Sequence, residues 1–222
     1  MTGIVFDLDG TLAESAPAIC AIANELMAEL GLPPLDVDEA RSYVGNGAAR
    51  FLERALEVRG GCSPEDFKVH FARFTALYEA APPEANEPMP GAGEALRALA
   101  AAGHRLALCT NKPMVPTRSL LKAFGWEDLF AVVIAGDSLP ERKPHPAPLL
   151  KAAADLDEPA PLYVGDSEVD AATAEAANVP FVIYARGYRQ TPLEEITHAA
   201  SFDTFGELPG LIDTLAAERR SG

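Results

Sequence analysis

Cysteine is scarce in this chain of 222 residues, and its placement argues against two kinds of scaffold. The three cysteines, Cys20, Cys62 and Cys109, are odd in number, far apart and without C-x-x-C spacing. A disulfide framework and a zinc knuckle are therefore not indicated, and reduced thiols are expected. The chain also lacks a run of about 18 uncharged apolar residues and a basic N-terminal region. We expect a cytoplasmic protein.

Basic residues are also few, because 18 Lys and Arg stand against 33 Asp and Glu, a formal net charge of −15. This charge repels nucleic-acid backbones and anionic membrane surfaces, so neither is expected as a partner. A small anionic substrate would need a locally positive pocket. Hydrophobic residues make up 48% and charged residues 23%, as is typical of a packed globular protein. The sequence does not distinguish a monomer from a dimer.

Apolar runs and helical patterns alternate along much of the chain. Short apolar runs occupy residues 3–6, 106–109, 132–135, 162–164 and 181–184. Helical patterns at 114–124, 146–156 and 168–177 separate the later runs. Strands that alternate with helices predict an α/β fold, in which helices cover both faces of a parallel sheet.

The segment from residue 15 to about 84 interrupts this alternation, because it has no strand-like run. Its first helix is predicted to begin at Ser15 as N-cap, with Pro17 in the first turn and an apolar stripe that continues to Leu30. Ser63 and Pro64 predict another helix start. Four prolines between residues 81 and 91 are typical of a stiff hinge. We predict an α/β core at 1–14 and 85–222 and an inserted all-α cap at 15–84.

The strongest chemical signal is the sequence DLDGT, from Asp7 to Thr11, directly after the first apolar run. Two carboxylates two residues apart at a strand end can face one pocket before Gly10 turns the chain away. One of them can attack a substrate while the other handles protons. A calcium-binding loop is excluded, because it would place Val5 where a carboxylate is needed. A solvated surface turn is the remaining alternative.

Polar groups follow later apolar runs as well. Thr110 and Asn111 are placed to hydrogen-bond phosphate oxygens at a strand end, and Lys143 could hold a phosphoryl group from a loop before a helix. Asp166 and Asp170 share one face of a helical turn. Turn formation, solvation or helix capping would explain each alone. Their recurrence at three strand ends instead favours one phosphate-and-metal site.

Electrostatic repulsion opposes the gathering of four carboxylates at one edge of the sheet, those of Asp7, Asp9, Asp166 and Asp170. Two like charges 4 Å apart repel by about 4 kcal/mol at an effective dielectric constant of 20. A dication is therefore expected among them. Oxygen ligands that leave room for water and a substrate phosphate favour Mg²⁺ over zinc or calcium.

Taken together and in this order, the four segments resemble the phosphatases of the haloacid dehalogenase superfamily that carry a helical cap after the first motif. Further stretches look like those of bacterial phosphoglycolate phosphatases: 43–48, 111–112, 143–146 and 186–188. The resemblance implies a Rossmann-like core with the first strand at the centre of the sheet. Two positions depart from the pattern, since Glu14 replaces a usual Asp and Asn178 replaces a usual Gly.

The resemblance also implies roles in phosphoryl transfer. It makes Asp7 the nucleophile, and Asp9 the acid that protonates the leaving alkoxide and then the base that activates water. Thr110 and Lys143 would bind the phosphoryl group.

The same resemblance implies a set of metal ligands. Asp7, the backbone carbonyl of Asp9, and Asp166 would ligate Mg²⁺. For Asp170 an indirect, supporting role is favoured, and direct ligation of the ion is the alternative.

The choice of substrate rests on the predicted cap. Gly45, Asn46 and Gly47 precede a helical stretch that carries Arg50, so backbone N–H groups and a cation could form an anion site. A tight interhelix turn is the alternative interpretation. A second anion site selects a short ester with a carboxylate, and we predict hydrolysis of 2-phosphoglycolate to glycolate and phosphate through an aspartyl-phosphate. A sugar phosphatase, a mutase, a pyrophosphatase or a non-catalytic binding protein would use the same core.

Overall fold

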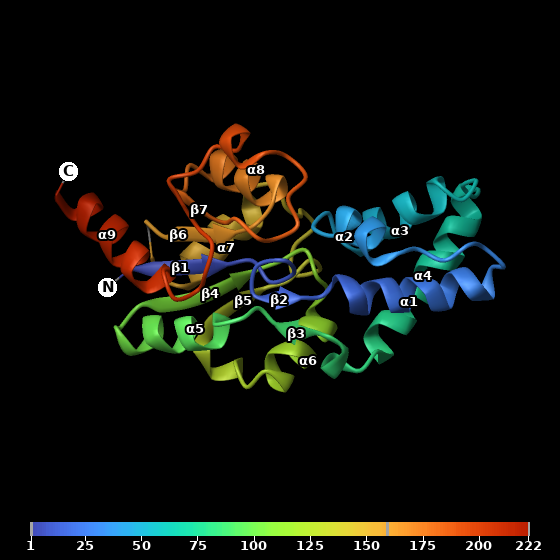
Figure 1. Ribbon diagram of the computed structural model, residues 1–222, viewed down its shortest axis with the longest axis horizontal. Helices are drawn as coiled ribbons and strands as arrows, with labels where there is room; N and C mark the ends of the chain where they lie inside the picture. The colour runs from blue at the N-terminus through green and yellow to red at the C-terminus, as the bar shows by residue number, and fades with distance from the viewer. Residues whose placement is uncertain (1, 159, 222) are drawn as a thin grey trace.

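The apolar runs form a six-stranded sheet in which all neighbouring strands are parallel (Figure 1). The computed structural model describes residues 2–158 and 160–221. The strands are β1 (Gly3–Phe6), β4 (Arg105–Cys109), β5 (Phe130–Ile134), β6 (Leu162–Gly165), β7 (Phe181–Tyr184) and β8 (Ala200–Phe202), in the order β5-β4-β1-β6-β7-β8. The predicted α/β class and the interior place of the first strand are confirmed. Strand β8 was missed because its three residues form no apolar run.

Alternate residues of β1 enter two different cores. Ile4 and Phe6 pack with residues of α5 (Ala92–Ala101), α6 (Met114–Ala123) and α9 (Leu208–Ser221). Val5 packs with residues of α7 (Ala147–Asp155) and α8 (Glu168–Ala177) on the other face. Burying each such side chain contributes about 1.5–3 kcal/mol. Burial on both faces fixes the carboxyl end of β1, where the first acidic motif begins.

Four helices form a separate group beyond the sheet (Figure 1). These are α1 (Ala16–Glu29), α2 (Val37–Tyr43), α3 (Ala48–Glu57) and α4 (Pro64–Ala80), and they share a hydrophobic cluster of their own. Strands β2 (Ala13–Glu14) and β3 (Glu87–Pro88) pair antiparallel where the chain enters and leaves this group. The division into core and cap at residues 15 and 84 stays a prediction. Three short 3₁₀ turns complete the described elements: η1 (Pro83–Ala85), η2 (Glu127–Leu129) and η3 (Leu193–Glu195).

The helix ends test the predicted caps. The hydroxyl of Ser63 accepts from Asp66 N–H at the start of α4, as predicted. Asn178 ends α8 in the left-handed conformation, at φ 54°, so it replaces glycine without losing the cap. Ser15 occupies the N-cap position of α1, but its hydroxyl makes no capping hydrogen bond. The predicted N-cap position is therefore confirmed, while a distant side chain, Tyr188, accepts from the first N–H groups. In residues 2–158 and 160–221, no helix has the length and apolar character needed to cross a membrane.

Candidate active site

The predicted functional side chains gather where the parallel strands end, because the carboxyl ends of such strands meet at one edge of a sheet. Asp7 follows β1, Thr110 follows β4, and Asp166 follows β6. Lys143 reaches the same edge from the loop before α7, and Asp170 from the first turn of α8. The structure thus brings these residues together from four separate segments of the chain.

Gly10 permits the tight turn after the two carboxylates of the first motif. Its φ is +87°, a conformation that residues with a side chain seldom adopt. A Cβ atom at this position would lie 2.5 Å from Asp166 Oδ2 and 2.7 Å from Tyr188 Cδ2. A side chain here would therefore displace Asp166 or Tyr188.

Three buried acids form one cluster. Asp7, Asp166 and Asp170 each offer a carboxylate oxygen, and these oxygens all lie within 4.8 Å of one another. Burial raises the pKa of Asp7 to about 7, although Lys143 opposes the rise. Burial also raises the pKa of Asp166 well above its usual value, with the charge of Asp170 adding to it. Added positive charge would keep both acids ionised, and this all-oxygen set suits a divalent cation.

The carboxylate of Asp170 is already saturated with hydrogen bonds. Its Oδ1 accepts from Lys143 Nζ at 2.7 Å and from Tyr163 Oη at 2.6 Å. Its Oδ2 accepts from Ser167 Oγ at 2.6 Å and from two backbone N–H groups, those of Asp166 and Ser167. Burial alone would raise the pKa of Asp170, but Lys143 and these donors lower it. Such bonding supports the predicted indirect role, in which Asp170 orients its neighbours.

Lys143 supplies the fixed positive charge of the site. Its Nζ lies 2.7 Å from both Asp7 Oδ1 and Asp170 Oδ1. Burial would lower the pKa of Lys143, but the two carboxylates outweigh that effect and raise it. The contact with Asp7 is an ion pair without hydrogen-bond alignment. Asp7 therefore keeps an oxygen that no hydrogen bond from a described residue holds.

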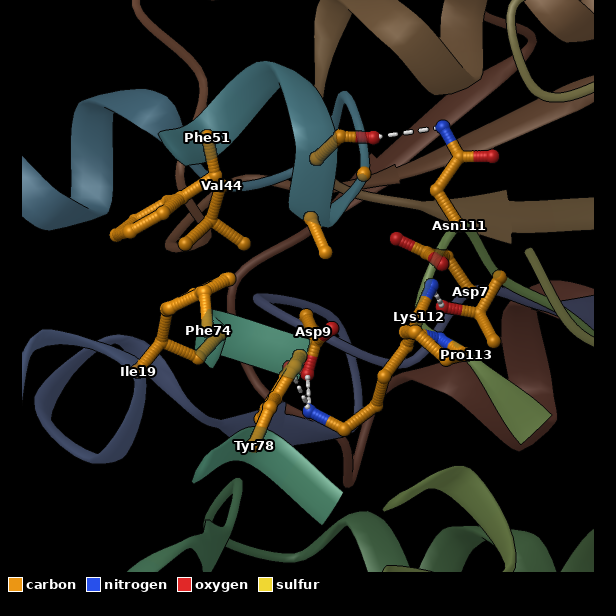
Figure 2. Close-up of a pocket in the computed structure, with 14 residues that line it drawn as sticks. Asp7, Asp9, Ile19, Val44, Phe51, Phe74, Tyr78, Asn111, Lys112 and Pro113 are labelled. Carbon is orange, nitrogen blue, oxygen red and sulfur yellow. Dashed lines mark hydrogen bonds and ion pairs between the residues drawn. The ribbon is translucent and has the colours of Figure 1, made fainter. Parts of the chain in front are cut away.

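Asn111 has a different contact from the predicted one with phosphate. Its Nδ2 donates to the carbonyls of Gly45 and Lys143, at 2.8 and 2.9 Å, and its Oδ1 accepts from Lys143 N–H. Figure 2 shows the first of these bonds, which crosses from the core to the predicted cap. The side-chain amide of Asn111 thus links the loop of Gly45 to the loop of Lys143.

Asp9 points away from the acid cluster and toward Lys112, a lysine of the 111–112 stretch to which the sequence analysis gave no role. Lys112 Nζ lies 2.9 Å from Asp9 Oδ1 and donates to Tyr78 Oη of α4 at 2.8 Å (Figure 2). Burial would lower the pKa of Lys112, but the charge of Asp9 outweighs it and the pKa is raised. The side chain of Asp9 therefore lies outside the acid cluster, which leaves its backbone carbonyl for the predicted metal contact.

The predicted substrate loop of the cap faces the site only in part. Gly45 and Gly47, at φ +107° and +86°, line the cavity above Asp7, with Asn46 between them in the chain. Arg50 does not line that cavity, because its guanidinium pairs with Glu53 one turn along α3, and its side chain is 45% exposed. Arg50 thus lies outside the predicted anion site in this structure, and the role of the glycine loop in substrate binding stays a prediction.

A cavity lies between the helical group and the strand ends. Its floor is made by Asp7, Asp9 and Thr110, and its remaining wall is largely apolar. The apolar lining comes mainly from α1, α3, α4 and the loop before α3, with these members: Ile19, Val44, Ala48, Phe51, Phe74 and Tyr78. Few polar partners are available there for a large hydroxylated ligand.

Tyr188 links this site to the start of the helical group. Its backbone N–H donates to Asp166 Oδ2 at 2.6 Å. Its hydroxyl donates to Glu14 at 2.6 Å and accepts from the N–H groups of Ser15 and Ala16. Glu14, one of the two departures noted above, thus binds Tyr188 at the point where the chain enters the helical group. Nothing local in the sequence predicts this contact across the chain.

Comparison with known proteins agrees with this geometry. A family model for haloacid dehalogenase-like hydrolases matches residues 1–178. The chain belongs to this family. A phosphoglycolate phosphatase of Cereibacter sphaeroides is 47% identical over 218 residues, covering 98% of this chain and 100% of that protein.

Solved structures with a similar fold point to the same kind of protein. The crystal structure of a predicted phosphoglycolate phosphatase from Haemophilus somnus superposes with a TM-score of 0.87 at 30% identity, covering 96% of this chain and 98% of that one. CbbY of Rhodobacter sphaeroides, solved with phosphate, superposes at 0.76 with 28% identity, covering 94% and 96%. The family is therefore one of hydrolases, and the relatives named here include phosphatases.

Proposed function

We propose that this haloacid dehalogenase-like hydrolase converts 2-phosphoglycolate to glycolate and phosphate, with Asp7 as nucleophile. The observation that carries the proposal is a buried carboxylate, Asp7, at the floor of a small cavity. Lys143 stands beside it as a fixed cation. The Cereibacter relative that bears the name of this activity matches along its full length.

The residues divide the reaction between them. Lys143 and Thr110 hold the phosphoryl oxygens while an oxygen of Asp7 attacks phosphorus, forming an aspartyl-phosphate. Asp9 gives a proton to the leaving glycolate oxygen. It then takes one from the water that attacks the same phosphorus, which releases phosphate and restores Asp7.

A divalent ion completes the proposed site, and we assign it as Mg²⁺. Asp7, Asp166 and the backbone carbonyl of Asp9 would hold it, while Asp170 orients Lys143 and the turn around Asp166. When bound, the ion neutralises charge on the phosphoryl group and on the crowded carboxylates. The raised pKa values of Asp7 and Asp166 support this assignment, since without a cation both sites favour the proton.

Residues 15–84 would act as the cap that encloses the leaving group. The apolar wall formed by Phe51 and Phe74 leaves sugar hydroxyls without partners, which favours a short substrate over a hexose phosphate. We place the reaction in the cytoplasm, where the three unpaired cysteines would stay reduced.

A panel of phosphate esters tests the proposal. The protein with Mg²⁺ would be assayed for phosphate release from 2-phosphoglycolate, glucose 6-phosphate, pyrophosphate and 4-nitrophenyl phosphate. We expect kcat/KM to be highest for 2-phosphoglycolate. A higher value for the hexose phosphate or pyrophosphate would overturn the substrate assignment, and no turnover of any ester would overturn the enzymatic role.

A further inference from the structure

The cavity contains a single positive side chain, and it is one to which the mechanism above gives no role. Of the 14 residues that line the cavity and are drawn in Figure 2, only Lys112 is cationic. Lys143 pairs with Asp7 at the phosphoryl end and is not among these lining residues, and Arg50 pairs with Glu53 on α3. An anionic group on the leaving side of the substrate would therefore meet one cation, Lys112.

Lys112 is held by two partners that also line the cavity, one from the first acidic motif and one from α4. Its Nζ donates to Asp9 Oδ1 at 2.9 Å and to Tyr78 Oη at 2.8 Å. The side chain is 2% exposed. An ammonium group carries three N–H donors, and residues 2–158 and 160–221 offer no further acceptor to it. The third donor is therefore free for a ligand.

A purely structural role for this lysine explains less of the geometry. A cation that only balanced Asp9 would not need to border the cavity or to contact Tyr78 of α4. That wall is otherwise apolar around Phe51 and Phe74, so a carboxylate placed there would be buried without a partner. Lys112 alone among the lining side chains can pair with it.

We propose that Lys112 is a specificity-determining residue that binds the carboxylate of the leaving group. The proposal rests on the function proposed above and replaces the role that the sequence suggested for Arg50. Asp9 and the substrate carboxylate would share one ammonium group, which holds the leaving oxygen next to the acid that protonates it. Only a short spacer between phosphate and carboxylate fits this arrangement, since both ends of the substrate are fixed.

Two substrates of similar size isolate the carboxylate contact. Ethyl phosphate resembles 2-phosphoglycolate but has a methyl group in place of the carboxylate. Any damage to Asp9 in a Lys112 variant affects both esters, so the informative quantity is the ratio of their kcat/KM values. We expect Lys112→Met to lower the preference for 2-phosphoglycolate by about 10- to 100-fold, the loss of one charge-assisted hydrogen bond.

Three further variants make the test specific. Lys112→Gln keeps N–H donors without the charge, and it should lower the preference in the same direction even if Lys112→Met does not fold. Tyr78→Phe removes the other partner of the ammonium group and keeps the charge, so the preference should change by less than about threefold. Arg50→Ala should also leave the preference unchanged, because that side chain pairs with Glu53.

The outcomes separate the two proposals. If the wild-type protein shows no preference for 2-phosphoglycolate over ethyl phosphate, the proposed function and the role of Lys112 both fail. If the wild type has the preference but both Lys112 variants keep it, the function stands and the role of Lys112 is overturned. If only Arg50→Ala loses the preference, Arg50 of α3 rather than Lys112 binds the carboxylate, and the proposal is overturned.

Discussion

Replacement of Lys143 by methionine should destabilise the protein strongly, and more so without Mg²⁺ than with it. Lys143→Met keeps most of the volume of the side chain but removes the charge between Asp7 and Asp170. With the lysine gone, the buried acids face one another, and no other cation among the described residues pairs with them. Bound Mg²⁺ would supply part of the missing charge, so we expect it to restore part of the lost stability.

The distances set the size of this effect. At 2.7 Å, each contact of Lys143 with a carboxylate corresponds to about 6 kcal/mol at an effective dielectric constant of 20. Desolvation of the three charged groups offsets most of that energy. Removal of one partner from a buried pair typically costs about 3–5 kcal/mol, and we expect a loss in this range in excess chelator.

Urea denaturation in chelator and in excess Mg²⁺ measures the effect, with the two curves compared at constant m value. Lys143→Arg serves as the control, because it keeps the charge and should lose less stability in both conditions. The turnover of Lys143→Met should also fall by about 10²- to 10³-fold, as for loss of a group that stabilises transition-state charge. A loss of stability below about 1 kcal/mol, or an equal loss with and without Mg²⁺, would refute the reasoning.

Three other outcomes follow from the contacts at the site. Because the pKa of Asp7 is raised from 3.8 to about 7, the metal-free folded protein binds more protons than the unfolded chain between these values. Its stability in chelator should therefore fall as pH rises across that range, and a midpoint of urea denaturation that rises instead would contradict the shift. Tyr188→Phe should cost about 1–3 kcal/mol in the same assay, since the Ser15 and Ala16 N–H groups and the Glu14 carboxylate lose their bonds to the hydroxyl; an unchanged midpoint would show that the hydroxyl does not stabilise the start of α1. Ca²⁺ should bind in place of Mg²⁺ but support little turnover, because its looser shell lets the Asp7 carboxylate bind with both oxygens; full activity in Ca²⁺ would argue against this arrangement.

Features encoded locally could be predicted from the sequence. Buried strands read as continuous apolar runs, so β1 and β7 were placed at their observed ends. Helix α8 was also placed correctly, because Ser167 and Asn178 mark its limits through their own backbone and side-chain bonds. That the two acidic motifs lie close together could be predicted from one rule, namely that the carboxyl ends of parallel strands meet at one edge of the sheet.

Features that depend on contacts across the chain could not be predicted. Lys112 meets Asp9 and Tyr78 from distant positions in the sequence, and no spacing rule connects them. Arg50 was assigned to the cavity from its position after a glycine loop. The glutamate three residues along the helix, Glu53, was a local sign that the side chain faces solvent. The Arg50–Glu53 pairing can be predicted from the sequence, because the two residues are three positions apart on one helix. The Lys112–Asp9 pairing, which brings a cation to the cavity, cannot.

The central claim, that Asp7 becomes phosphorylated, can be tested in the Asp9→Asn variant with 4-nitrophenyl phosphate and Mg²⁺. This ester has a leaving group that needs no proton, so the first step should proceed while hydrolysis of the aspartyl-phosphate slows. We predict a burst of about one nitrophenolate per enzyme molecule. Quenching with borohydride should then convert residue 7 to homoserine, detected by peptide mass spectrometry. Steady turnover without a burst, or a burst with residue 7 unmodified and another residue reduced, would contradict the account.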